Sequence, residues 1–130
     1  MDKKKILIIE DDRDFFRLLA MSLRANDYEV SIASDAIAAI SETRKLSPDL
    51  ILLDLGLPAG DGFLVMERLK AIPSVADIPV IVVSARDPAI NKDQALKAGA
   101  AAYFLKPADD NELMAAIKQA LGEVKLRIAD

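Results

Sequence analysis

Short apolar runs recur along the chain and alternate with segments of helical periodicity. Four runs are uninterrupted, at 6–9, 50–53, 80–83 and 103–105, whereas a fifth, at 28–32, mixes apolar and polar residues. Uninterrupted apolar runs are typical of strands that are buried on both faces, and an alternating run is typical of an edge strand with one wetter face. The pattern therefore predicts five strands, with the second at an edge of the sheet.

The segments between these runs have the periodicity of amphipathic helices. In the first segment, apolar residues at positions 16, 19, 20 and 23 share one helix face. Ser34 is placed to cap a second helix over 35–45. A third helix has an apolar face that extends to Ile72, and Pro73 ends it. Each of these helices can bury one face against a sheet.

The last two helices complete a regular alternation of strands and helices. Asp87-Pro88 is typical of an N-cap and a first-turn proline, and it marks the fourth helix. The fifth carries apolar residues from Leu113 to Ile128, so that 122–130 either extends this helix or frays. The alternation predicts an α/β fold, a doubly wound five-stranded parallel sheet with helices on both faces. We expect a single domain over 1–130, with its core at about 4–121.

Ligands of an open α/β sheet bind outside the carboxyl ends of its strands, near the switch in strand order. Here acids follow the first and third strands, a hydroxyl follows the fourth and a lysine follows the fifth. These residues are Glu10, Asp11, Asp12, Asp54, Ser84 and Lys106. Their side chains converge only if the strands that carry them are neighbours. The placement therefore predicts the strand order 2-1-3-4-5.

The composition narrows the chemistry that is open to these residues. The 130 residues include neither Cys nor His, which excludes disulfides, thiol catalysis, imidazole bases and ordinary zinc sites. The net charge of −4 gives no indication of direct nucleic-acid binding. The apolar run at 6–9 is too short for a signal peptide or a membrane span. We therefore expect a cytoplasmic protein that does not associate with membranes.

Carboxylates at one edge of a sheet repel one another unless a cation lies between them. Because only oxygen ligands are available, the expected cation is a hard one such as Mg²⁺. A carboxylate can also act as a nucleophile and form an aspartyl phosphate, and phosphoryl transfer depends chiefly on positioning and charge neutralisation. Asp12 and Asp14 have a simpler explanation, since they can cap the first helix and complement its dipole. The joint placement of the other groups favours a phosphoryl-transfer site.

Several segments match one family in order and spacing. They are 6–11 (ILIIED), 54–58 (DLGLP) with 61–62 (DG), 78–85 (IPVIVVSA), and 98–99 (AG) followed by 103–107 (YFLKP). With these segments the chain resembles, over roughly 4–121, the receiver domain of bacterial two-component response regulators (CheY-like). The resemblance implies a flavodoxin-like (βα)5 fold and a place in a phosphorelay.

The resemblance also implies how the acids are used. Asp54 is then the phosphoacceptor, which attacks a phosphohistidine on a partner kinase. Glu10 and Asp11 are implied to hold Mg²⁺ or Mn²⁺, together with Asp54 and the backbone carbonyl of Gly56. Gly56 and Arg86 occupy the two positions from which the family tunes hydrolysis of the phosphorylated state.

The remaining strand-end residues are implied to detect the phosphoryl group. Ser84 and Lys106 would bind its oxygens, and Tyr103 would swing inward as a coupled aromatic switch. An alternative for Tyr103 is an edge aromatic that packs on the last helix. The Lys106-Pro107 peptide bond is implied to be cis.

These roles imply a phosphoacceptor signalling switch that catalyses only its own phosphorylation and dephosphorylation. The implied partners are a sensor histidine kinase or a phosphotransfer protein, and a downstream protein or output domain that reads the face of the fourth helix, fifth strand and fifth helix. Two alternatives are a phosphorylation-independent, protein-binding pseudo-receiver and an aspartyl-phosphate phosphohydrolase. The intact set of site residues argues against the first. Gly56 argues against the second, because haloacid-dehalogenase-like enzymes carry a second Asp at that position.

Overall fold

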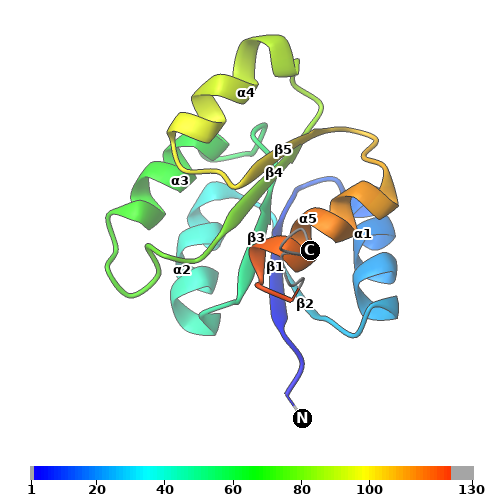
Figure 1. Ribbon diagram of the computed structural model, residues 1–130. Helices are drawn as coiled ribbons and strands as arrows, with labels where there is room; N and C mark the ends of the chain where they lie inside the picture. Colours follow the sequence, from blue (N-terminus) through cyan, green and yellow to red (C-terminus); the bar gives the residue numbers. More distant parts are fainter. Residues whose placement is uncertain (1, 124–130) are drawn as a thin grey trace, which may run out of the picture.

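Five strands alternate with five helices within residues 2–123, which the computed structural model describes (Figure 1). The strands are β1 (Lys5–Ile9), β2 (Glu29–Ala33), β3 (Leu50–Leu53), β4 (Val80–Ser84) and β5 (Ala102–Leu105). The helices are α1 (Arg13–Ala25), α2 (Ala36–Leu46), α3 (Gly62–Lys70), α4 (Pro88–Lys97) and α5 (Asp110–Ala120). The predicted alternation of elements is therefore confirmed.

All five strands are parallel and lie in the order β2-β1-β3-β4-β5, as predicted. The register brings the carboxyl ends of the strands to the same edge. Ile9, at the end of β1, pairs with Ala33 on one side and with Leu53 on the other. Leu53 pairs in turn with Val82 of β4. The residues that follow β1, β3 and β4 therefore start from neighbouring positions.

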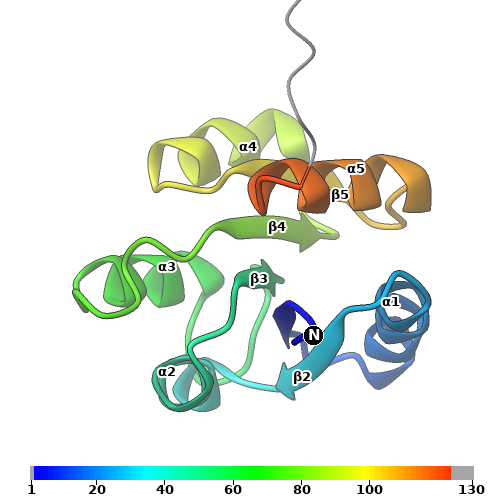
Figure 2. The ribbon, with the colours of Figure 1, turned by 60° about the horizontal axis from the view of Figure 1, so that its bottom comes forward.

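Helices cover both faces of the sheet, with α1 and α5 on one face and α2, α3 and α4 on the other (Figure 2). Successive residues of one strand point to opposite faces. Leu7 packs in the cluster that contains Met66 of α3, whereas Ile8 packs in the cluster that contains Leu23 of α1 and Ile117 of α5. This double burial explains why the strands have uninterrupted apolar sequences.

The prediction that Ser34 caps the second helix is wrong by one residue. Asp35 is the N-cap of α2, and its carboxylate accepts a hydrogen bond of 2.7 Å from the backbone N–H of Ala38. Its extended backbone, with φ −151° and ψ 173°, allows this reach. The prediction of Asp87 as the N-cap and Pro88 as the first residue of α4 is confirmed.

Two helix ends also differ from the sequence pattern. The third helix ends at Lys70, with Ala71 as its C-cap, so Ile72 lies beyond it and packs against the core from a turn. The last helix ends at Ala120. The expected continuation over 124–130 lies outside the described residues. No described helix is both long enough and apolar enough to cross a membrane.

Tyr28 provides a pH-dependent test of the packing between the residue before β2 and the segment that follows α5. Its buried phenol donates a 3.0 Å hydrogen bond to the Glu123 carboxylate. Burial, followed by this bond and the charge of Glu123, raises the pKa of Tyr28 from 10.0 to about 12.

Because the folded state keeps this proton longer than the unfolded state, we expect the free energy of unfolding to decline between pH 10 and about pH 12. The contribution of Tyr28 is complete below the unfolded pKa and is lost as the pH rises through the folded pKa. Urea unfolding at several pH values, compared with Tyr28→Phe, measures this slope. Equal slopes for the wild type and the variant would contradict the assignment.

Candidate functional site

Three acids meet at the carboxyl edge of the sheet. Glu10 and Asp11 follow β1, Asp54 follows β3, and one carboxylate oxygen from each lies within 4.8 Å of the others. The backbone fixes two of them, since the N–H of Glu10 donates to Ala33 (2.9 Å) and the N–H of Asp54 donates to Ile9 (3.0 Å). These bonds continue the strand ladders by one residue. The strand register therefore determines that the acids converge, as the sequence predicts.

Lys106 supplies the positive charge beside these acids. Its Nζ lies 2.5 Å from Glu10 Oε1 and 3.6 Å from Asp54 Oδ2, and its side chain is 17% exposed. Its backbone N–H donates 2.9 Å to the carbonyl of Ser84, so β4 positions it. The peptide bond between Lys106 and Pro107 is cis. The structure thus brings the lysine to the two acids that are buried.

The electrostatics of the acid cluster favour a bound cation. Glu10 is only 2% exposed, and this burial raises its carboxyl pKa from 4.5 to about 7; the charge of Asp54 adds to the rise, whereas the Lys106 hydrogen bond opposes it. A buried carboxylate of this kind gains from any further positive charge. The donors are all oxygen atoms, which is the set that Mg²⁺ prefers. The residues therefore fit a hard divalent cation.

Ser84, Arg86 and Tyr103 form a hydrogen-bonded group next to the acids. Ser84 is buried, and its Oγ accepts a 3.2 Å bond from the backbone N–H of Arg86. The Tyr103 hydroxyl donates 2.7 Å to the backbone carbonyl of Arg86. The loop after β4 thus makes hydrogen bonds, through the backbone of Arg86, to both Ser84 and Tyr103.

The alternative that Tyr103 packs on the last helix is wrong. Tyr103 is 8% exposed and belongs to the core cluster that contains Ala95 of α4, whereas Leu113 of α5 belongs to the cluster on the other face. Its position in β5 explains this, because Tyr103 pairs with Val82, which faces the α4 side. Burial, the largest effect, raises the pKa of the Tyr103 phenol.

An ion pair that the sequence analysis did not predict joins two loops at the site. The Arg86 guanidinium donates 2.7 Å to the Asp61 carboxylate, and the side chains are 37% and 42% exposed. The other oxygen of Asp61 caps α3 by accepting 2.9 Å from the N–H of Phe63. Of the two roles of Asp61, only the N-cap of α3 has a signal in the sequence, namely the Asp61-Gly62 pattern. The pairing depends on a contact between the loops after β3 and β4, for which the sequence has no local signal.

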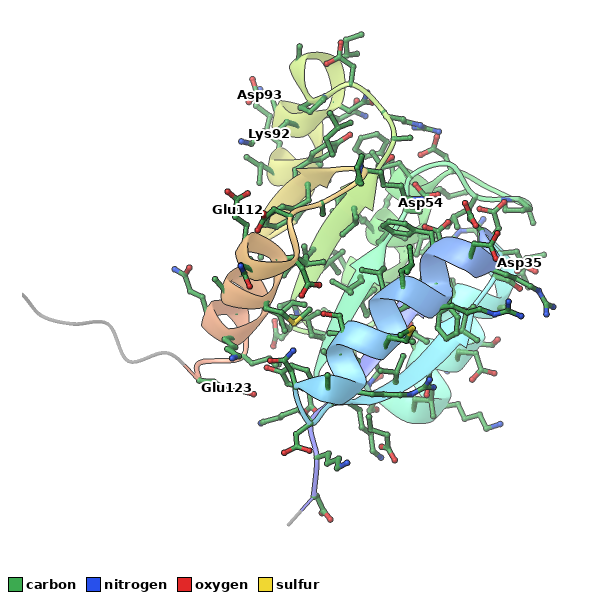
Figure 3. All side chains as sticks on the ribbon, turned by 90° about the vertical axis from the view of Figure 1, so that its right-hand side faces the viewer. Asp35, Asp54, Lys92, Asp93, Glu112 and Glu123 are labelled. Carbon is green, nitrogen blue, oxygen red and sulfur yellow. The ribbon has the colours of Figure 1, made fainter. Side chains whose placement is uncertain are left out.

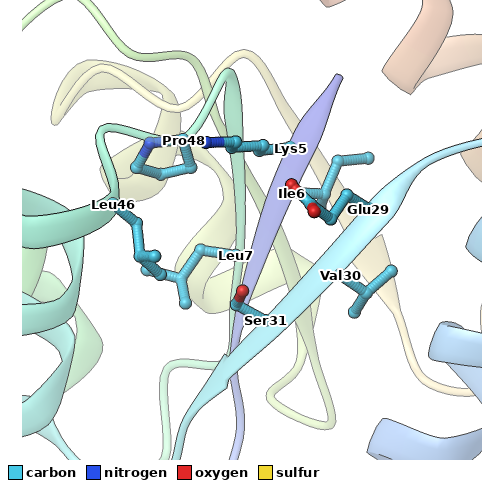
Figure 4. A pocket seen from close by; sticks show the side chains of 8 residues that line it. All are labelled: Lys5, Ile6, Leu7, Glu29, Val30, Ser31, Leu46 and Pro48. Carbon is cyan, nitrogen blue, oxygen red and sulfur yellow. The ribbon is translucent and has the colours of Figure 1, made fainter. Parts of the chain in front are cut away.

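A groove of about 290 Å³ lies at the opposite, amino-terminal ends of β1 and β2 (Figure 4). Its two charged lining residues, Lys5 and Glu29, are exposed and have opposite signs, and its other lining residues include Leu46 and Pro48. None of its lining residues is a buried polar one. We therefore place the candidate site at the acid cluster and not in this groove.

Comparison with known proteins agrees with this geometry. The family model of the response regulator receiver domain matches residues 6–118. The chain therefore belongs to the response regulator receiver domain family, the signalling modules of two-component systems.

Response regulator PleD of Caulobacter vibrioides is 39% identical over 114 residues, which are 88% of this chain and 25% of PleD. The chain spans 25% of the length of PleD and 50% of the length of the sensory transduction protein RegX3 of Mycobacterium tuberculosis.

Two solved structures have the same fold. A putative response regulator from Chloroflexus aurantiacus has a TM-score of 0.89 at 29% identity, covering 93% of this chain and 99% of that one. The receiver domain of sensor histidine kinase PA1611 from Pseudomonas aeruginosa, with a magnesium ion coordinated in the active site cleft, has a TM-score of 0.84 at 28% identity, covering 93% and 99%.

Gly62 sets how closely α3 approaches the Asp54 segment. A Cβ at this position would lie 2.7 Å from the backbone oxygen of Asp54 and 2.7 Å from Cα of Leu55. Both contacts are with backbone, which cannot move without displacing the acid. We expect Gly62→Ala to lower the free energy of unfolding by about 1–3 kcal/mol, as overpacking of a close contact does.

Gly56 is the matched control, because nothing lies within 4 Å of a Cβ built there. We expect Gly56→Ala to leave the free energy of unfolding unchanged or to raise it by up to about 1 kcal/mol. Urea unfolding of both variants measures the difference. Equal stabilities would show that the close approach at Gly62 does not constrain the Asp54 segment.

Proposed function

We propose that this chain is a phosphoacceptor switch in which Asp54 receives a phosphoryl group from a phosphohistidine. The donor is a sensor histidine kinase or a phosphotransfer protein, and the reaction depends on Mg²⁺ or Mn²⁺. The observation that carries the proposal is the convergence of Asp54 with two further acids and Lys106 at one sheet edge. The proposal includes a cytoplasmic location, as the sequence analysis expects.

The residues present are sufficient for this transfer. An oxygen of the Asp54 carboxylate attacks the phosphorus, the P–N bond of the phosphohistidine breaks, and the leaving nitrogen keeps the electron pair. A bound divalent cation would neutralise negative charge on the acids and on the phosphoryl oxygens. Glu10, Asp11 and Asp54, with the backbone carbonyl of Gly56, are the residues proposed to hold it. The magnesium described for the PA1611 receiver domain supports this choice of cation.

The phosphorylated state is proposed to act through the residues around Asp54. Lys106, which now lies 3.6 Å from Asp54, would pair with the phosphoryl oxygens, and the Ser84 hydroxyl would donate to them. Ser84 and Tyr103 both bond to the backbone of Arg86, and through this shared partner a movement of Ser84 would be passed to Tyr103. Gly56 and Arg86 are the positions proposed to tune hydrolysis.

The output is proposed to pass through the face formed by α4, β5 and α5. Ile90 of α4 is 75% exposed and Leu105 of β5 is 46% exposed, so this face offers apolar surface to a partner. A downstream protein or an output domain would bind this face after phosphorylation has changed it. Phosphorylation then acts as a population shift between two arrangements of this face.

The first test is phosphorylation of Asp54 by a small donor. We expect incubation with acetyl phosphate and Mg²⁺ to give one phosphoryl adduct in the intact mass, and a chelator to prevent it. Asp54→Asn should abolish the adduct because it removes the nucleophile.

Asp35→Asn is a matched control for this experiment. Asp35 and Asp54 lie toward the same end of the molecule (Figure 3), but Asp35 caps α2, and Asn caps a helix as well as Asp does. The control should keep the adduct. No adduct on the wild type, either from acetyl phosphate or from a phosphorylated kinase, would contradict the proposal and favour a phosphorylation-independent binding module.

The second test concerns competition between Lys106 and the metal for Glu10. We expect Lys106→Met to lower the free energy of unfolding without metal by about 1–3 kcal/mol, because buried Glu10 loses its cationic partner. The same variant should bind Mg²⁺ more tightly than the wild type, because the ammonium no longer competes for the carboxylate. Mg²⁺ should therefore restore part of the lost stability.

Lys92→Met on α4 is the control, because Lys92 is exposed and lies apart from Asp54 in the molecule (Figure 3). It should change neither the stability nor the Mg²⁺ affinity. Isothermal titration calorimetry gives the affinities. Weaker Mg²⁺ binding by Lys106→Met would contradict the competition.

A further inference from the structure

Phe15 makes a contact with Lys106 that the proposed transfer does not use. Phe15 lies in the first turn of α1, and the Lys106 Nζ sits 4.3 Å from the centroid of its ring. Cations within about 6 Å of an aromatic face are attracted by the quadrupole of the ring, and more strongly when they are desolvated. The Lys106 side chain is 17% exposed. The contact therefore has an electrostatic part as well as an apolar one.

Four residues close a continuous circuit around this contact. The Phe15 backbone N–H donates 3.1 Å to Asp12 Oδ1, and the Asp12 N–H donates 3.2 Å to Glu10 Oε2. The other oxygen of Glu10 accepts the bond from Lys106, whose ammonium faces the Phe15 ring. The segment that carries Glu10 thus also holds the backbone of Phe15, from which the ring projects. Asp12 is the N-cap of α1, as the sequence predicts, and the cap has this second consequence.

We propose that Phe15 is a positioning residue that keeps the Lys106 ammonium beside Asp54 when Glu10 is engaged by a divalent cation. This inference rests on the proposed function. Without the cation, Glu10 is the nearest partner of Lys106, at 2.5 Å. A cation at the acids weakens the hold of Glu10 on Lys106, because both draw on the same carboxylate. The ring is neutral and does not ligate Mg²⁺, so its attraction for the ammonium persists.

A purely structural role for Phe15 makes a different prediction. Phe15 is partly buried against the core cluster of α1 and α5, so its removal also creates a packing defect. If packing were its only role, then shape and volume alone would matter. If the ring attracts the ammonium, then the negative potential of its face matters at constant shape.

Ring fluorination separates these roles, because each fluorine withdraws charge from the ring face and changes the shape little. We would replace Phe15 by phenylalanines with one, two and three ring fluorines and measure the rate of phosphorylation by acetyl phosphate at saturating Mg²⁺. We expect a stepwise decline, in total about twofold to tenfold, as the loss of one cation–π contact implies.

Phe16 provides the matched control for the same series. It is the next residue of α1 and is also partly buried against the α1 and α5 cluster, so it shares the packing environment of Phe15. Fluorination of Phe16 should produce no trend. A flat series at Phe15, or equal trends at both positions, would overturn the positioning role.

A second readout needs no phosphorylation. The methylene protons next to the Lys106 ammonium should show an upfield ring-current shift in the NMR spectrum, and this shift should persist when Mg²⁺ is added. It should be lost in Phe15→Leu and retained in Phe15→Tyr. Loss of the shift in the wild type on addition of Mg²⁺ would contradict the claim that the ring holds the ammonium in the metal-bound state.

The two hypotheses fail in distinguishable ways. No adduct on wild-type protein would contradict the proposed function, and with it the role of Phe15 in transfer. An adduct on the wild type together with a flat fluorination series would contradict the role of Phe15 alone.

Discussion

Glu10, Asp11 and Asp54 approach one another closely, and every other feature of the site depends on this accumulation of negative charge. Charges of one sign at this distance repel strongly in a partly buried position. The Lys106 ammonium compensates this repulsion directly, since it contacts Glu10 and lies near Asp54. A divalent cation can provide the same compensation from the open side. In the function proposed above, the cation would take over part of this compensation, and Lys106 would then be available to the phosphoryl group.

The fold makes this accumulation possible by holding the strand ends in register. Helices cover both faces of the sheet, and the buried side chains fix the positions of the strands. Two of the acids extend the strand ladders by one hydrogen bond each, so their backbones are held side by side. The loops after β3 and β4 are then joined by the pair of Asp61 and Arg86. A rigid base and connected loops are what a switch at this edge requires.

The sequence predicts the parts of this arrangement that depend on local pattern and strand order. Uninterrupted apolar runs indicated double burial, and the residues after them indicated which strands had to be neighbours. Asp12 was predictable as a cap because its partners, the N–H groups of Asp14 and Phe15, are close in sequence. For the cap of α2 the sequence offers two good capping residues, Ser34 and Asp35. The backbone angles that select Asp35 are not visible in the sequence, so the prediction of Ser34 is off by one residue.

Contacts between elements that are far apart in sequence were not predictable in the same way. Phe15 meets Lys106 only because the first turn of α1 packs beside the end of β5. The side of the sheet on which Tyr103 packs depends on its register with Val82. Arg86 meets Asp61 across two loops whose conformations no periodic pattern describes. Each of these contacts depends on how distant segments pack in the folded structure, and a local sequence pattern does not contain this information.

The most direct test of this account is a two-step NMR titration of backbone amides, first with Mg²⁺ and then with beryllofluoride as a phosphoryl mimic. The account predicts that Mg²⁺ shifts the amides of 10–12 and 54–57, and that beryllofluoride then shifts those of 84–87 and 102–106. This order would show that the cation binds at the acids and that a group in the phosphoryl position changes the surroundings of Ser84, Tyr103 and Lys106. Mg²⁺ shifts that are absent at the acids, or beryllofluoride shifts that do not reach the end of β4 and β5, would contradict it.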